Sequence, residues 1–77
     1  MSFDELLEYE GREIEFYYEN NKYSISVCRD GIWYLTKYGD HENAQEFKSS
    51  MDLIHNATID NILIKEICEN FEIDVIY

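Results

Sequence analysis

Apolar residues recur at two different spacings along this chain, and the alternation between the two predicts its elements. Near the start, Ser2 and Glu5 fit a capping box, in which the Ser2 side chain and the Glu5 carboxylate each satisfy a free amide of the first helical turn. Gly11 suits the end of a helix, because glycine readily takes left-handed backbone angles. We therefore expect a helix over residues 2–10. Its apolar face would carry Phe3, Leu6 and Leu7.

Residues 12–28 change to strict alternation, which is typical of two half-buried strands joined by a tight turn. A two-residue turn at Asn20-Asn21 is favoured, since asparagine tolerates positive φ. This turn predicts four cross-strand pairs: Glu19 with Lys22, Tyr18 with Tyr23, Phe16 with Ile25, and Ile14 with Val27. The register joins apolar residues three times and an acid to a base once.

The next turn has two readings. Arg29-Asp30-Gly31 forms a three-residue loop closed by glycine, or Asp30-Gly31 alone forms a two-residue turn. The first pairs Val27 with Trp33 and Ile25 with Leu35, and it turns Trp33 and Leu35 toward the core. The second reverses both faces. We favour the first, because the second would put the indole of Trp33 on the face of the glutamates and serines.

The second half of the chain predicts a short fourth strand and two helices. The strand spans 44–48 with Phe47 inward, and Ser49 or Ser50 caps a short helix that carries Leu53, Ile54 and Ala57. Asp60 begins a longer helix over 60–71. Its apolar face carries Leu63, Ile64, Ile67, Cys68 and Phe71. The tail from Glu72 to Tyr77 alternates again, as an edge strand or an extended terminus.

These elements predict one small α+β domain over residues 1–77. Its sheet would be an antiparallel three- to four-stranded β-meander packed against one N-terminal and two C-terminal helices. The longer helix would place Leu63, Ile67 and Phe71 on the sheet face that bears Phe16, Ile25 and Trp33. A chain of 77 residues has too little apolar surface for a second core.

Charge narrows the classes of partner. Seventeen Asp and Glu stand against six Lys and Arg, for a net charge of −11. The charge lies on two acidic flanks around a near-neutral, tyrosine-rich centre at residues 21–40. An anionic membrane or a directly bound nucleic acid is disfavoured by this balance, whereas a protein partner fits it. We expect a monomer or weak homodimer.

No catalytic, cofactor or metal motif is recognisable. The chain has no nucleophile elbow, metalloprotease helix or phosphate-binding glycine loop. Asp40-His41-Glu42 is read as a solvated turn, since neighbouring loop residues rarely converge on one ion. His55 is assigned a surface or packing role, and Cys28 and Cys68 are expected as reduced packing thiols. We expect no enzyme, cofactor or metal.

Two surfaces remain as candidate binding sites. In the favoured register Tyr17, Tyr34 and Tyr38 share a face with small hydroxyl residues, either as half-buried packing under a helix or as a protein-docking platform. Glu13, Glu15 and Glu19 line one strand, either as a solubilising face or as an imitation of nucleic-acid phosphates. Protein binding through the tyrosines is the first hypothesis, and a nucleic-acid-mimic inhibitor is the alternative.

Several runs resemble small acidic uncharacterised proteins of low-GC Gram-positive bacteria and their phages and mobile elements. They are Arg12-Glu-Ile-Glu-Phe-x-Tyr18, Lys22-Tyr-Ser-Ile, Trp33-Tyr-Leu, Phe47-Lys-Ser-Ser-Met-Asp-Leu53 and Ile62-Leu-Ile-Lys-Glu-Ile67. The resemblance implies a cytoplasmic setting and an accessory or inhibitory role, and it carries no catalytic residue across.

Overall fold

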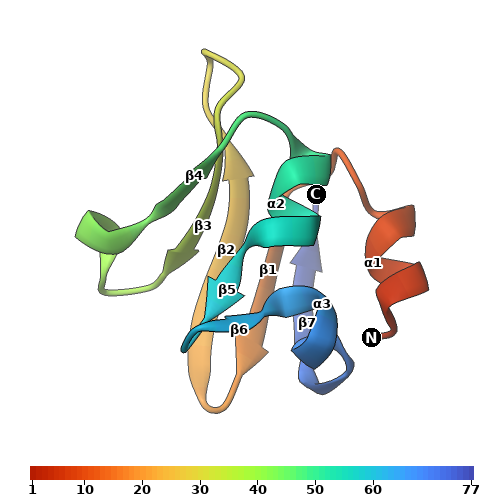
Figure 1. The fold of residues 1–77 in the computed structure, drawn as a ribbon. Helices are drawn as coiled ribbons and strands as arrows, with labels where there is room; N and C mark the ends of the chain where they lie inside the picture. Colours follow the sequence, from red (N-terminus) through yellow and green to blue (C-terminus); the bar gives the residue numbers. More distant parts are fainter.

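The computed structural model describes residues 1–77 and has an α+β fold, as the sequence predicts. A five-stranded antiparallel sheet has the order β4-β3-β2-β1-β7, and β5 and β6 form a separate two-stranded sheet (Figure 1). The strands are β1 (Ile14–Tyr18), β2 (Asn21–Val27), β3 (Trp33–Lys37), β4 (Gln45–Phe47), β5 (Thr58–Ile59), β6 (Ile62–Leu63) and β7 (Glu72–Ile76).

The helices are short. They are α1 (Phe3–Glu8), α2 (Ser50–Asn56) and α3 (Ile64–Ile67), with 3₁₀ turns η1 (His41–Asn43) and η2 (Cys68–Asn70). None of them has the length and apolar character that crossing a bilayer requires.

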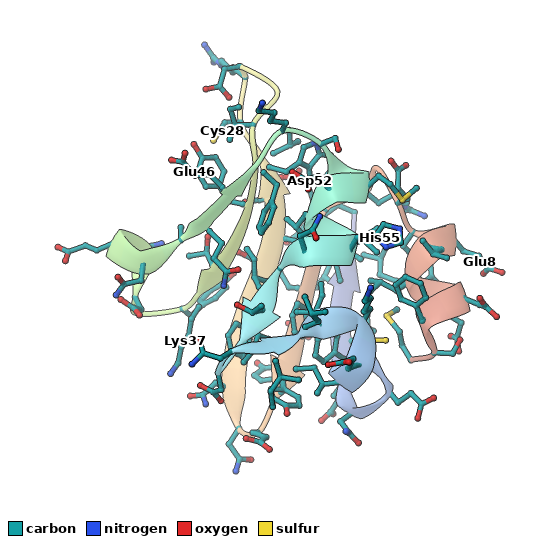
Figure 2. All side chains as sticks on the ribbon, viewed as in Figure 1. Glu8, Cys28, Lys37, Glu46, Asp52 and His55 are labelled. Carbon is teal, nitrogen blue, oxygen red and sulfur yellow. The ribbon has the colours of Figure 1, made fainter.

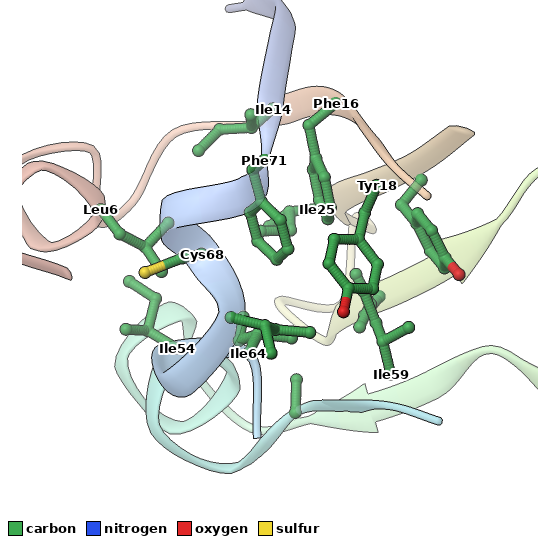
Figure 3. Close-up of a cluster of buried hydrophobic side chains, with 14 of the residues drawn as sticks. Leu6, Ile14, Phe16, Tyr18, Ile25, Ile54, Ile59, Ile64, Cys68 and Phe71 are labelled. Atoms are coloured by element: carbon green, nitrogen blue, oxygen red, sulfur yellow. The ribbon is translucent and has the colours of Figure 1, made fainter. Parts of the chain in front are cut away.

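All three helices and the β5–β6 hairpin lie on one side of the large sheet (Figure 1). We call this side the inner face and the opposite side the outer face. One cluster of 15 buried side chains fills the space between the inner face and the helices (Figure 3). Strand residues of the cluster alternate, as expected for a sheet with one buried face.

The stacked rings of Phe16 and Phe71 lie at the centre of this core. Their centroids are 4.1 Å apart with an interplanar angle of 22°, and Phe16 is fully buried. The Tyr23 ring stacks on Phe16 from β2 at 5.5 Å, and Tyr18 meets Phe71 edge-on at 5.6 Å. Because Phe71 directly precedes β7, the stack places the last strand next to the first.

The capping box at the start of α1 is confirmed. The Glu5 amide donates to the Ser2 hydroxyl at 3.1 Å, and the Ser2 amide donates back to the Glu5 carboxylate at 3.3 Å. The helix ends at Glu8, and Gly11 then takes φ of +85°. Its amide donates to the Ser50 hydroxyl of α2 at 2.8 Å, which fastens the connection to the helix layer.

The first hairpin has a register two residues away from the predicted one. Phe16 pairs with Tyr23 and Ile14 with Ile25, because the turn is Glu19-Asn20, with φ of +47° and +65°. A shift of two residues keeps every side chain on its predicted face, so alternation alone could not distinguish the two registers. The observed one brings the rings of Phe16 and Tyr23 into contact.

The second hairpin follows the favoured reading. Val27 pairs with Trp33 and Ile25 with Leu35 around the three-residue loop, and Gly31 has φ of +83°. Leu35 is buried, and Trp33 is partly buried against the core. Val27, predicted to pair with Ile14, is instead 37% exposed, since β2 extends beyond the end of β1.

The fourth strand and the second helix also form as predicted. β4 pairs with β3 through Phe47 and Trp33, and both side chains pack partly against the core. Ser49 is the residue that caps α2, with its hydroxyl accepting from the Asp52 amide at 3.0 Å. Leu53, Ile54 and Ala57 are buried beneath it.

The predicted helix over 60–71 is wrong. Asp60 and Asn61 form a tight turn with φ of +53° and +65°, and the chain pairs Ile59 with Ile62 across it. Only the single turn of α3 and the following η2 are helical. Four of the five predicted apolar residues still reach the core, because a short hairpin and one helical turn bury them: Ile64, Ile67, Cys68 and Phe71. Leu63, predicted to face the sheet with them, is only partly buried in β6.

The tail forms an edge strand, which is one of the two predicted alternatives. β7 pairs with β1 through Ile14–Ile76 and Tyr17–Glu72, with a shift of register between. Asp74 is the extra residue of this β-bulge, and its side chain reaches Lys22 on the outer face. Bulges redirect a side chain in this way.

Replacement of Phe71 by alanine should lower the free energy of unfolding by about 3 kcal/mol or more, because it removes a ring from the centre of the core. A domain of this size is stable by only about 3–5 kcal/mol, so the variant should be largely unfolded in urea-free buffer. Urea titration followed by circular dichroism measures the loss. Met51→Ala, at an exposed position of α2, is the control. A loss of less than about 1 kcal/mol at Phe71 would contradict the central place of the stack.

The turn at Asn61 can be tested by the order of two substitutions. At φ of +65°, alanine should cost about 1 kcal/mol relative to glycine, which has no Cβ to clash. In the first turn of the predicted helix the order would reverse, since alanine is a better helix former than glycine. Urea midpoints of Asn61→Gly and Asn61→Ala therefore distinguish the observed hairpin from a continuous helix.

Candidate functional site

The outer face of the sheet is the surface that no helix covers. Tyr17 is 40% exposed there and Tyr38 is 47% exposed. Its other members lie on the five strands or directly beside them: Glu13, Glu15, Lys22, Ser24, Ser26, Tyr34, Thr36, Glu46, Glu72, Asp74, Val75 and Tyr77. The face therefore combines large phenol rings, small hydroxyl side chains and carboxylates.

Lys22 organises the centre of this face. Its ammonium group lies 2.9 Å from the Glu15 carboxylate and 3.2 Å from that of Asp74. It also lies 4.8 Å from the centre of the Tyr38 ring and 5.7 Å from that of Tyr17. The hydrogen bond with Glu15, followed by that with Asp74, raises the pKa of Lys22 above its ordinary value. Carboxylates and ring faces together hold this cation in place.

Glu15 accepts hydrogen bonds from three side chains. The Tyr77 hydroxyl donates to one carboxylate oxygen, and Lys22 and the Tyr38 hydroxyl donate to the other, the latter at 2.9 Å. These bonds, with that from Tyr77 contributing most, lower the pKa of Glu15 from 4.5 to about 2. The same carboxylate raises the pKa of both phenols, because it accepts from their protonated forms. Glu15 is thus a permanently charged acceptor at neutral pH.

A shallow hollow of about 270 Å³ lies beside this cluster. Tyr38 and Tyr77 border it, and the small residues Ser24 and Ser26 leave room within it. The carboxylates of Glu13 and Glu15 lie along its lining. One Glu13 oxygen accepts from the Val27 amide at 3.1 Å. The hollow thus presents phenols and carboxylates to a visiting group.

The three predicted platform tyrosines lie on the outer face. Tyr17 and Tyr38 flank Lys22, whereas Tyr34 lies farther along β3, opposite Ser26 and Glu46. Tyr34 is only partly exposed, and its burial raises its pKa. The structure therefore brings together Tyr17 and Tyr38 and leaves Tyr34 at the side nearer β4.

The three predicted glutamates do not form a row of free carboxylates. Glu13 holds the Val27 amide, and Glu15 is occupied by Lys22, Tyr38 and Tyr77. Glu19 lies in the first hairpin turn with a left-handed backbone. Equal spacing along an ideal strand cannot show which carboxylates the fold uses internally.

Sequence reasoning missed Lys22, Asp74 and Tyr77 as parts of this face. The alternation of the tail was visible, but alternation does not tell which strand the tail joins. Once β7 lies beside β1, the Tyr77 amide donates to the Glu13 carbonyl at 2.9 Å, and its phenol reaches Glu15. The Arg12 Nε also donates to the Tyr77 carbonyl at 2.7 Å.

Other residues with reactive side chains lie elsewhere. Cys68 is buried in the core as predicted, and burial raises its pKa, but Cys28 is exposed beside the second hairpin loop (Figure 2). Cys28 was expected to pack in the interior. It is exposed because β2 extends beyond the end of β1 here. His55 packs edge-on against Phe3 with ring centroids 5.6 Å apart. No three His, Cys, Asp or Glu residues are grouped to hold a metal ion, and Asp40 accepts from the Asn43 amide at 2.8 Å instead.

Comparisons with family models, curated proteins and solved structures find no match to this chain.

The hydrogen bonds to Glu15 should make the free energy of unfolding depend on pH in the acid range. The unfolded chain binds the Glu15 proton near pH 4.5 and the folded chain near pH 2, so this group stabilises the fold above pH 4.5 and loses that effect as pH falls toward 2. Carboxyl ¹³C NMR should give Glu15 a midpoint near 2. Glu15→Gln should make the decrease in the free energy of unfolding between pH 4.5 and 2 smaller. The control Glu46→Gln should show the same decrease as the wild type. A Glu15 midpoint near 4.5 would contradict the bonding described.

Proposed function

We propose that this protein is a non-enzymatic protein-binding module that docks through the outer face of its sheet. The observation that carries the proposal is an uncovered face on which exposed phenols surround a hollow with carboxylates in its lining. Tyrosine supplies rigid contact area at little entropic cost, which is why it is enriched at protein interfaces.

The chemistry of the hollow favours a basic side chain of the partner. Tyr38 and Tyr77 offer ring faces and hydroxyls. One oxygen of the Glu13 carboxylate accepts from the Val27 amide, and the other is open to a partner. An arginine could contact a ring and a carboxylate together. With a net charge of −11, the chain also attracts a basic surface from a distance.

The pKa directions in the cluster support binding rather than acid–base chemistry. Glu15 is held ionised by a pKa of about 2, and the pKa of Lys22 is raised. General acid–base catalysis works best with a group that exchanges its proton near the working pH. Neither residue is suited to that near neutrality, so the cluster serves this face as a fixed arrangement of charge.

The resemblance to small acidic proteins of Gram-positive bacteria and their mobile elements suggests the setting. We place the module in the cytoplasm, as an accessory or inhibitory factor of a phage or mobile element that acts on a basic host protein. The module needs no cofactor for this role.

Capture from a lysate of such a bacterium tests the proposal. Tyr17→Ala and Tyr38→Ala should each weaken recovery of the partner at least ten-fold, as expected when an interface aromatic contributes more than about 1.4 kcal/mol. Met51→Ala, which removes an exposed apolar side chain on the helix side, is the matched control. If both tyrosine variants recover the partner as well as the wild type, docking through the outer face is wrong.

The same capture separates the nucleic-acid-mimic alternative. A partner bound by carboxylates alone should be lost steeply as salt rises and should not be recovered by the Glu13, Glu15 and Glu19 triple glutamine variant. A partner held by the phenols should survive at higher salt. The internal bonds of Glu13 and Glu15 favour the second outcome.

A further inference from the structure

The two edge strands of the large sheet, β4 and β7, differ in how much backbone they leave free for pairing. At one edge, β4 has only three residues, and its Gln45 side chain is bonded to the Thr58 backbone of β5. The Gln45 amide donates to the Thr58 carbonyl at 2.6 Å and accepts from the Thr58 amide at 3.0 Å. These bonds tie β4 to β5, and its three residues leave little backbone for pairing with a further strand.

The other edge, β7, is longer. It has five residues, includes no proline, and ends the strand order of the sheet. Helix α1 is the nearest element beyond it in Figure 1, yet α1 is fixed to the helix layer. The Phe3 ring meets His55 of α2, and the Met1 amino group donates to the Glu69 carbonyl of η2 at 3.4 Å.

The backbone of β7 is directed for pairing with a further strand. The Tyr77 amide faces β1, where it donates to the Glu13 carbonyl at 2.9 Å. Residues of an antiparallel ladder face the partner strand alternately, so the N–H and C=O of Ile76, which lies opposite Ile14, are directed away from β1. Exposed edges of this kind accept extended segments.

We propose that the open edge of β7 binds an extended, basic segment of a protein partner as a sixth strand. Charge selects this occupant. Glu72 and Asp74 are exposed on the strand itself, although Asp74 also pairs with Lys22. Helix α1, beyond the edge in Figure 1, carries the further acids Asp4, Glu5 and Glu8. A segment that alternates lysine or arginine with apolar residues would meet carboxylates with one face and Ile73 or Ile76 with the other.

A second copy of this chain is a poor occupant of the same edge. Pairing two β7 strands would bring Glu72 and Asp74 close to the same residues of the other copy, in a complex of two chains that each carry −11. Like charges directly across a strand pair are destabilising. The bulge at Asp74 also interrupts long regular pairing, which limits the occupant to a short segment.

The inference deepens the proposed function and rests on it in one respect, that the partner is a protein. It uses different atoms, however. The outer face acts through the side chains of Tyr17 and Tyr38, whereas this edge acts through the backbone of β7.

N-methylation of Ile76 tests the edge without changing a side chain. The methylated chain can be assembled by ligating residues 1–67 to a synthetic 68–77 peptide at Cys68 and refolding the product. The probe is a capped seven-residue peptide that alternates lysine and valine, followed by ¹H–¹⁵N NMR at low salt. The unmodified protein should bind it with shifts concentrated in β7, and N-methylation should weaken binding at least ten-fold.

Two controls keep the result interpretable. The methylated protein retains every charge, so unspecific attraction to the basic peptide would persist in it, and binding within two-fold of the unmodified protein would overturn the inference. A glutamate–valine peptide should not bind. In the unmodified protein, the lysine–valine peptide should also slow hydrogen exchange of the Ile76 amide at least ten-fold. No slowing, or no binding at millimolar peptide, would overturn the edge site while leaving the tyrosine variants to decide the outer face.

Discussion

The stack of Phe16 on Phe71 is the contact on which the rest of this structure depends. It joins the first strand of the chain to the residue that leads into the last, and it does so in a fully buried position. Tyr18 and Tyr23 extend the ring cluster across β1 and β2. The helices pack on this side, so the inner face of the sheet is covered and the outer face is exposed.

That division explains why the polar chemistry gathers on the outer face. A lysine in the middle of a sheet needs partners, and Lys22 finds them in Glu15, Asp74 and two phenol rings. The bulge in β7 turns Asp74 toward this centre. A chain with seventeen acids thus uses two of them to fix its one central cation. The remaining carboxylates set the charge of the surfaces around it.

Much of the fold could be predicted because it depends on neighbouring residues. The capping box of Ser2 and Glu5 acts within one helical turn, and the glycine-closed loop before Trp33 sets a register by steric and pattern rules. Alternation assigned Tyr17 and Tyr38 to one face correctly. In the first hairpin it could not separate two registers that share the same faces, and the ring contact of Phe16 with Tyr23 decided between them.

The amino-acid sequence by itself determined most of the side chains that are buried, because the hydrophobic effect depends on their identity and spacing. Only the tertiary structure decided which helices, strands and turns bring these side chains into the core. The apolar positions from Leu63 to Phe71 fit a helix, but the left-handed turn at Asp60-Asn61 and one turn of α3 bury those from Ile64 onward instead. It likewise decided that β7 joins β1 and that Tyr77 reaches Glu15. Those contacts span about sixty residues, and local periodicity contains no information about partners so distant in the chain.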